Sequence, residues 1–160
     1  MKKISIIMGS HSDLGTVNET VNVLKEFKVD FDLKVLSAHR TPHEVAQYVE
    51  TAPNRGTKVF IAAAGMSAAL AGVVAAHTTL PVIGIPIETK NLKGLDSLLS
   101  TVQMPPGIPV ACMSIGRAGA KNAALFALAI LGINDTKISA KLINYKKKMR
   151  LKIKQTKIKL

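Results

Sequence analysis

Short apolar runs recur along the chain, and each is followed by a stretch with helical periodicity. The runs expected to form strands are residues 3–8, 30–37, 57–64, 80–87 and 108–115. Helices are expected over residues 13–27, 41–52, 67–78, 95–104 and 118–132, and a charged helix completes the chain. Apolar strands without a polar face are typical of a parallel sheet covered by helices on both sides. The alternation therefore predicts an α/β fold, a three-layer αβα sandwich with a parallel five-stranded sheet and right-handed crossovers.

Length and composition agree with a single globular body. The chain has 160 residues, of which 48% are hydrophobic and 20% charged, enough for a core of aliphatic side chains. We expect an α/β domain over residues 1–132 and a basic C-terminal helix over residues 133–160. The lone Cys112 excludes an intrachain disulfide, and the apolar run near the N-terminus is too short for a signal peptide or a membrane span. These features predict a cytoplasmic protein.

The positive charge is concentrated in the tail. Residues 1–136 carry 12 basic and 10 acidic side chains, whereas residues 137–160 carry 10 basic and no acidic ones. Such a tail can bind nucleic acid or an anionic membrane. However, Ile138, Leu142 and Tyr145 begin one apolar stripe at helical spacing, and Lys outnumbers Arg 18 to 4. We therefore favour a helix packed on a neighbouring subunit, and we expect neither a nucleic-acid nor a membrane partner.

In a parallel α/β sheet, ligands bind beyond the carboxyl ends of the strands, so the loops there deserve the closest reading. After the first strand, Gly9 permits a close backbone approach, and Ser10 and Ser12 offer hydroxyls at the start of a helix. Free N–H groups at a helix N-terminus favour an anion such as a phosphate. Asp13 can accept two sugar hydroxyls. A helix cap explains the same residues without a ligand, and neither a Walker loop nor a dinucleotide fingerprint is present.

The loop after the second strand, "SAHRTP", holds a histidine beside an arginine. Arg40 can clamp a phosphate through two N–H groups, and His39 can exchange protons near neutral pH. A turn with a surface cation accounts for both residues equally well, but the position beside the first loop favours a functional role. Thr41 is expected to be the N-cap residue of the following helix, with Pro42 at its first position.

The loop after the third strand, "AGMSAALAG", lacks any side chain that acts as an acid, a base or a metal ligand. Its small residues and backbone amides suit the close approach of a flat or small neutral ligand, and they suit tight helix packing equally well. Since no His, Cys, Asp or Glu set has metal-ligand spacing, we expect no metal.

Taken together, "IIMGSHSD", "VLSAHRTP", "SLLSTVQMPPGIPVA" and "GRAGAKNAAL" resemble the bacterial class of the N5-carboxyaminoimidazole ribonucleotide mutase family. The resemblance extends over about residues 3–132. It implies a flavodoxin-like fold and a homo-octamer with its sites at subunit boundaries. It also implies a cofactor-free enzyme of purine biosynthesis. This enzyme moves a carboxyl group from the exocyclic nitrogen of an imidazole ribonucleotide to ring carbon 4.

The resemblance also implies roles for individual residues. Ser10, Ser12 and Arg40 would hold the 5′-phosphate and Asp13 the ribose, while His39 would carry the proton. The wider substrate-binding set expected from it comprises Gly9, Ser10, Ser12, Asp13, Ser37, Arg40, Ala64, Gly65, Ser67 and Leu70. Within this set, the residues from Ala64 onward would wrap the carboxylate or the released carbon dioxide.

One departure from the family pattern keeps alternatives open. Many bacterial members read "GGAAHLPG" where this chain reads "GMSAALAG", so Ala69 stands in place of a second histidine and Ala71 in place of a proline. The chain is expected to be the mutase, with His39 as general acid and base. The alternative is a carboxylase that adds free carbon dioxide to aminoimidazole ribonucleotide, as in the animal-type relatives. A second alternative is a non-enzymatic nucleotide or nucleic-acid binding module that uses the first loop and the basic tail.

Overall fold

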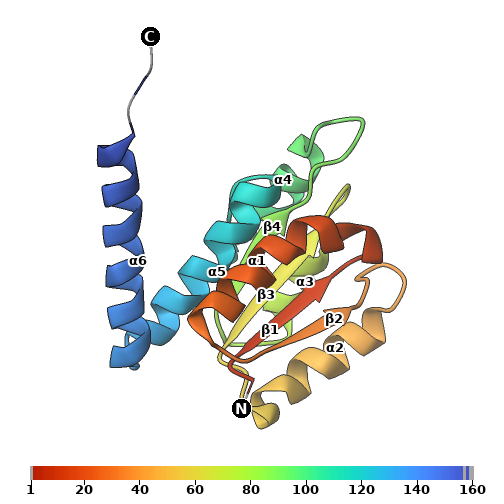
Figure 1. Ribbon diagram of the computed structural model, residues 1–160. Coiled ribbons are helices and arrows are strands. Elements are labelled where there is room, and N and C mark those ends of the chain that lie inside the picture. The colour runs from red at the N-terminus through yellow and green to blue at the C-terminus, as the bar shows by residue number, and fades with distance from the viewer. Residues whose placement is uncertain (1, 157, 159–160) are drawn as a thin grey trace.

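The computed structural model describes residues 2–156 and 158, and within them the chain forms one parallel sheet (Figure 1). Its strands are β1 (Ile4–Met8), β2 (Phe31–Val35), β3 (Val59–Ala64), β4 (Val82–Pro86) and β5 (Ala111–Cys112). They lie in the order β2-β1-β3-β4-β5, and every neighbouring pair is parallel. The predicted fold class is therefore confirmed, including the flavodoxin-like arrangement of its strands.

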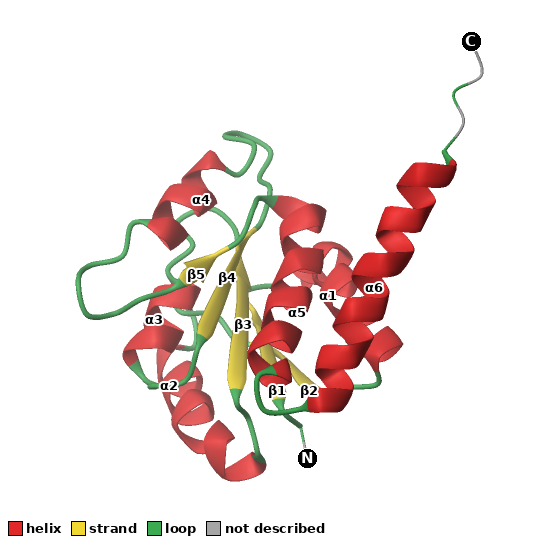
Figure 2. Cartoon of the chain, turned by 90° about the vertical axis from the view of Figure 1, so that its left-hand side faces the viewer, coloured by secondary structure: helices red, strands yellow, loops and turns green. Residues whose placement is uncertain are grey.

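The helices cover both faces of the sheet. They are α1 (Leu14–Phe27), α2 (Pro42–Thr51), α3 (Leu70–Ala76), α4 (Leu95–Val102), α5 (Gly116–Gly132) and α6 (Thr136–Gln155), with short 3-10 helices at His11–Asp13 and Ala52–Arg55. Figure 2 shows α1 and α5 on one side of the sheet and α2, α3 and α4 on the other. None of the helices in the described part of the chain is long and apolar enough to cross a bilayer.

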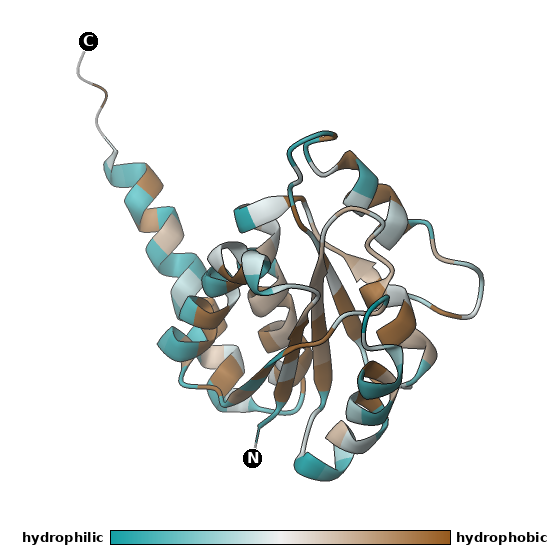
Figure 3. Cartoon of the chain, turned by 90° about the vertical axis from the view of Figure 1, so that its right-hand side faces the viewer, coloured by the Kyte–Doolittle hydropathy of each residue, from teal (hydrophilic) through white to brown (hydrophobic). Residues whose placement is uncertain are grey.

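The core is divided between these two faces, because alternate residues of each strand point in opposite directions. In β1, Ile4, Ile6 and Met8 join the cluster under α1 and α5, whereas Ile7 joins the cluster under α2 and α3. Figure 3 shows the resulting apolar strands between helices with hydrophilic outer faces. Burial of this apolar surface is the main force that holds the helices on the sheet.

Two elements are shorter than the sequence pattern predicts. The fifth strand, expected over residues 108–115, contains only Ala111 and Cys112, and Pro109 within the expected run cannot donate to a strand ladder. The helix expected from residue 67 begins only at Leu70. Residues 66–69 instead form tight turns, with Met66 at a φ of 58°.

Thr41 stands at the N-cap position of α2, as predicted, but its side chain makes no capping hydrogen bond to the helix. Its hydroxyl accepts from the Ser37 N–H at 2.9 Å and donates to the Ser37 carbonyl at 3.1 Å. The hydroxyl therefore closes the loop between β2 and α2, since Ser37 competes successfully with the helix for it.

Helix α6 packs on the body only through its first half. Ile138 is 4% exposed, and Leu142 and Tyr145 lie against the cluster under α1 and α5. The second half extends away from the sandwich (Figure 1), and there Met149 and Ile153 are 46% and 76% exposed. That α6 packs on a neighbouring subunit stays a prediction.

Candidate active site

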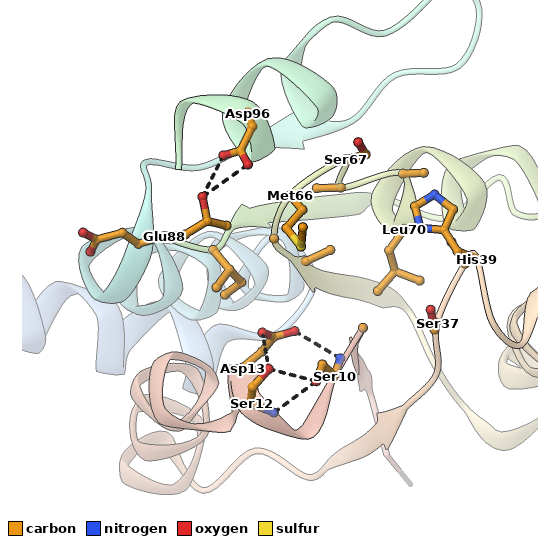
Figure 4. A pocket seen from close by; sticks show the side chains of 18 of the residues that line it. Ser10, Ser12, Asp13, Ser37, His39, Met66, Ser67, Leu70, Glu88 and Asp96 are labelled. Carbon is orange, nitrogen blue, oxygen red and sulfur yellow. Dashed lines mark hydrogen bonds between the residues drawn. The ribbon is translucent and has the colours of Figure 1, made fainter. Parts of the chain in front are cut away.

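A cavity of about 900 Å³ lies at the carboxyl ends of the strands, where the loops after β1, β2, β3 and β4 meet (Figure 4). It is lined by every residue that the sequence singled out, namely Gly9, Ser10, Ser12, Asp13, Ser37, His39, Arg40, Ala64, Gly65, Ser67 and Leu70. Because these residues come from three separate loops, their convergence follows from the parallel topology.

The loop after β1 is held in shape by its own polar groups. The Gly9 N–H donates to the Ala63 carbonyl at 3.0 Å, which ties the loop to β3. Ser10 caps the short 3-10 helix, and its hydroxyl accepts from the Ser12 N–H at 3.3 Å and from the Ser12 hydroxyl at 2.8 Å. The predicted helix cap is therefore present, and the same hydroxyls also line the cavity. The arrangement is compatible with both predicted roles, the helix cap and the binding of an anion.

Asp13 is the buried carboxylate of the site, with only 8% of the residue exposed. Burial raises the pKa of this carboxyl. The Ser10 N–H, the Ser12 hydroxyl and the charge of Arg40 each oppose that rise without cancelling it. A ligand that donates two hydroxyls would replace the hydration that Asp13 has lost, and it would therefore favour the ionised form.

Arg40 joins the loops after β1 and β2. Its Nη2 donates to the Gly9 carbonyl at 2.8 Å, and its Nε donates to the Ser37 hydroxyl at 3.3 Å. A guanidinium has five N–H donors in a fixed plane, so this exposed side chain keeps donors for a bound anion. The arrangement places a permanent positive charge beside the Ser10 and Ser12 hydroxyls.

His39 lies at the edge of the cavity, one residue before Arg40. Figure 4 shows its ring on the Leu70 side of the pocket, across from Asp13. The residue is exposed, so its imidazole is accessible both to a ligand in the pocket and to water. The pocket thus contains a permanent cation, a buried carboxylate and an exposed imidazole.

The loop from β4 to α4 forms a further wall of the pocket. The strand-end rule predicts this loop as part of the same surface, but no site residue was chosen from it. Its lining residues are Ile87, Glu88, Thr89, Lys90 and Asn91, with Asp96 on the first turn of α4. The Thr89 hydroxyl lies 3.1 and 3.2 Å from the two carboxylate oxygens of Asp96 (Figure 4). The rule that selected the first three loops also selects this one, because it too follows a parallel strand.

Comparison with known proteins agrees with this site. The family model described as AIR carboxylase matches residues 3–152. The N5-carboxyaminoimidazole ribonucleotide mutase of Pyrococcus abyssi is 56% identical over 94% of this chain and 85% of its own length. The mutase of Saccharolobus solfataricus is 50% identical over 99% of both chains. The crystal structure of Treponema denticola PurE superposes with a TM-score of 0.86 at 29% identity, covering 96% of this chain and 94% of that one. The chain belongs to the AIR carboxylase family.

Proposed function

We propose that this protein converts N5-carboxyaminoimidazole ribonucleotide into 4-carboxy-5-aminoimidazole ribonucleotide in purine biosynthesis. The observation that supports this most strongly is the pocket formed by polar loops in a chain that is 50% identical to a mutase over nearly its whole length. The pocket provides separate groups for a phosphate, a sugar and a proton transfer, as a ribonucleotide isomerase requires.

The substrate would bind along the loops after β1 and β2. The phosphate would accept hydrogen bonds from the Ser10 and Ser12 hydroxyls and from the free N–H groups of Arg40. The ribose hydroxyls would donate to Asp13, whose burial makes it a strong acceptor once ionised. The heterocycle would then lie between His39 and the loop after β3.

His39 would take part in two proton transfers. As imidazolium it would donate to the carbamate nitrogen, the nitrogen–carbon bond would break, and carbon dioxide would leave with a neutral amine behind. Ring carbon 4 would attack the trapped carbon dioxide with its enamine-like electron pair. The neutral imidazole would then take the proton from carbon 4. Holding the gas beside the ring makes this recombination effectively unimolecular.

The alternative activity is carboxylation of aminoimidazole ribonucleotide by free carbon dioxide. One observation favours it: Ala69 lines the pocket where the bacterial pattern described above has a histidine. The deciding experiment gives purified protein the carbamate ribonucleotide or, separately, aminoimidazole ribonucleotide with bicarbonate. Saturation at low carbamate concentration with poor use of bicarbonate supports the mutase, and the reverse result supports the carboxylase. Ribonucleotide binding without either reaction would leave only a binding module.

We also propose that the protein works as a homo-octamer in the cytoplasm, with the outer half of α6 on a neighbouring subunit. The support is the apolar stripe of α6, which is buried at Ile138 and continues to the exposed Met149 and Ile153. In light scattering, Ile153→Glu is expected to shift the mass toward smaller species. Ile143→Glu is the matched control, because Ile143 is 66% exposed on another face of α6. An unchanged mass for Ile153→Glu would contradict the proposal.

A further inference from the structure

Met66 has a backbone conformation that methionine rarely adopts. Its φ is 58°, in the left-handed region, where a side chain crowds the backbone and glycine does not. The bacterial pattern "GGAAHLPG" has glycine at this position. Lys28 and Lys93, with φ of 54° and 52°, share the conformation among the described non-glycine residues, but neither lines the pocket.

The structure on both sides of Met66 prevents this backbone from relaxing. Before it, the Ala64 carbonyl accepts from the Ile87 N–H at 2.9 Å, and a Cβ on Gly65 would lie 3.2 Å from the Thr89 methyl carbon. After it, the Ala68 N–H donates to the Met66 carbonyl at 2.8 Å in a tight turn. Strain that the surroundings enforce in this way is typical of functional sites.

The apolar side chain of Met66 is also exposed to solvent. The residue is 69% exposed although methionine is apolar, and it lines the cavity. Figure 4 shows the thioether pointing from the loop after β3 into the pocket, whose opposite wall carries Asp13 and Ser10. Both the backbone strain and the apolar exposure are unfavourable in the free chain, and a ligand that covers the side chain would offset them.

We propose that the thioether of Met66 covers the heterocycle of the bound ribonucleotide and keeps water away from its reacting carboxyl group. This inference rests on the proposed function. A thioether is flexible and polarizable, and it packs well against a flat ring. The small Ala69 side chain leaves room beside the ring. Leu70 of the same loop is buried, whereas the exposed side chain of Met66 can close this space.

The test compares Met66→Gly, Met66→Leu and a control, Lys28→Gly. Glycine relieves the left-handed backbone in both glycine variants, so both are expected to unfold at a higher temperature than the wild type. Only Met66→Gly is expected to lose activity, with a fall of about tenfold in kcat/KM for the carbamate ribonucleotide, since it loses the contact of one apolar side chain. It should also release more free aminoimidazole ribonucleotide per product formed. Met66→Leu keeps the apolar cover and should stay within about threefold of the wild type.

The other possible results separate the role of Met66 from the proposed function. Unchanged kcat/KM and unchanged release in Met66→Gly overturn the role of Met66 while the proposed function stands. If the wild type binds aminoimidazole ribonucleotide without converting the carbamate, the proposed function fails. The affinities of wild type and Met66→Gly for that ribonucleotide then decide the role of Met66, and equal affinities overturn it. A wild type that binds no ribonucleotide overturns both.

Discussion

The two ends of the sheet carry similar polar side chains, but these form a closed hydrogen-bond network at the amino ends of the strands and line an open cavity at the carboxyl ends. At the amino ends of the strands, the Ser5 and Thr57 hydroxyls lie 2.7 Å apart, and Tyr48 donates to Ser5 at 3.2 Å and to Asp32 at 3.1 Å. Lys2 completes the group with an ion pair to Asp32 at 3.1 Å. At the carboxyl ends, the hydroxyls of Ser10 and Ser12, the Asp13 carboxylate and the Arg40 guanidinium line a cavity. There they face open space and do not form a closed network with one another.

The two aspartates express this difference directly. Burial favours a higher pKa for Asp32, but hydrogen bonds from Lys2 and Tyr48, with the charges of Lys2 and Lys34, outweigh it, so that pKa is lowered. Burial dominates at Asp13, whose pKa is raised despite its hydrogen bonds. A closed polar network stabilises the protein by itself, whereas an open one becomes favourable only when a ligand completes it.

The largest expected effect is a loss of activity at the carboxyl ends of the strands, the open end that lines the cavity. His39→Asn should lower kcat by about a thousandfold, because proton transfer by a positioned side chain contributes factors of this size. The unfolding temperature should not change, since the ring is exposed. His43→Asn is the matched control, because His43 is exposed and does not line the pocket. Full activity of His39→Asn, measured with the carbamate ribonucleotide, would contradict the mechanism.

Arg40→Lys should have the next largest effect. It keeps the charge but loses the planar pair of donors, so KM for the ribonucleotide should rise about tenfold with a smaller change in kcat. The same measurement with the nucleoside, which lacks the 5′-phosphate, provides the control. If the variant weakens the nucleoside and the ribonucleotide equally, Arg40 does not bind the phosphate.

At the amino ends of the strands, where the polar network is closed, Tyr48→Phe should change the stability of the protein and not its activity. The change removes the hydroxyl that Ser5 and Asp32 share, and it should lower the free energy of unfolding by about 1 kcal/mol. Urea unfolding measures the loss, and steady-state kinetics should show no change. A variant with normal stability and reduced activity would break the distinction between the two ends.

The smallest effects are opposite pH dependences at Asp13 and Asp32. The raised pKa of Asp13 stabilises the fold below the ordinary aspartate value, and this contribution is lost as pH rises through the raised pKa. Asp13→Asn should therefore unfold at a higher temperature than the wild type at neutral pH. The lowered pKa of Asp32 stabilises the fold above the ordinary value and is lost as pH falls through the lowered pKa. Asp32→Asn should therefore be less stable at neutral pH, and shifts of the same sign in both variants would contradict the assignment.

The sequence predicts the fold and most of the pocket for one physical reason. Apolar runs place the strands, and parallel strands bring the loops that follow them to one edge. Ser10, Arg40 and Gly65 could be chosen from this rule and from the family resemblance. The rule also reaches the loop of Thr89, but nothing in the sequence pairs its hydroxyl with Asp96, a residue already inside the next helix.

Other features depend on which of several possible partners a group binds, and the sequence pattern does not say which. The Thr41 hydroxyl has a helix end and Ser37 within reach, and only the folded loop shows which it binds. Met66 is placed by contacts of its neighbours with β4 and the loop after it, so its left-handed backbone has no local signal. Local periodicity therefore finds elements, whereas loop conformation depends on partners far away in the sequence.

The outermost strands have a consequence for how copies of this protein can meet. One edge of the sheet is β5, which contains only two residues, and the other is β2, where Asp32 and Lys34 place opposite charges along a five-residue strand. Short and charged borders are poor templates for further strand pairing. Pairing between the sheet edges of two copies, a route that leads to fibres, is thus disfavoured, and the helices and loops are left as the surfaces for association.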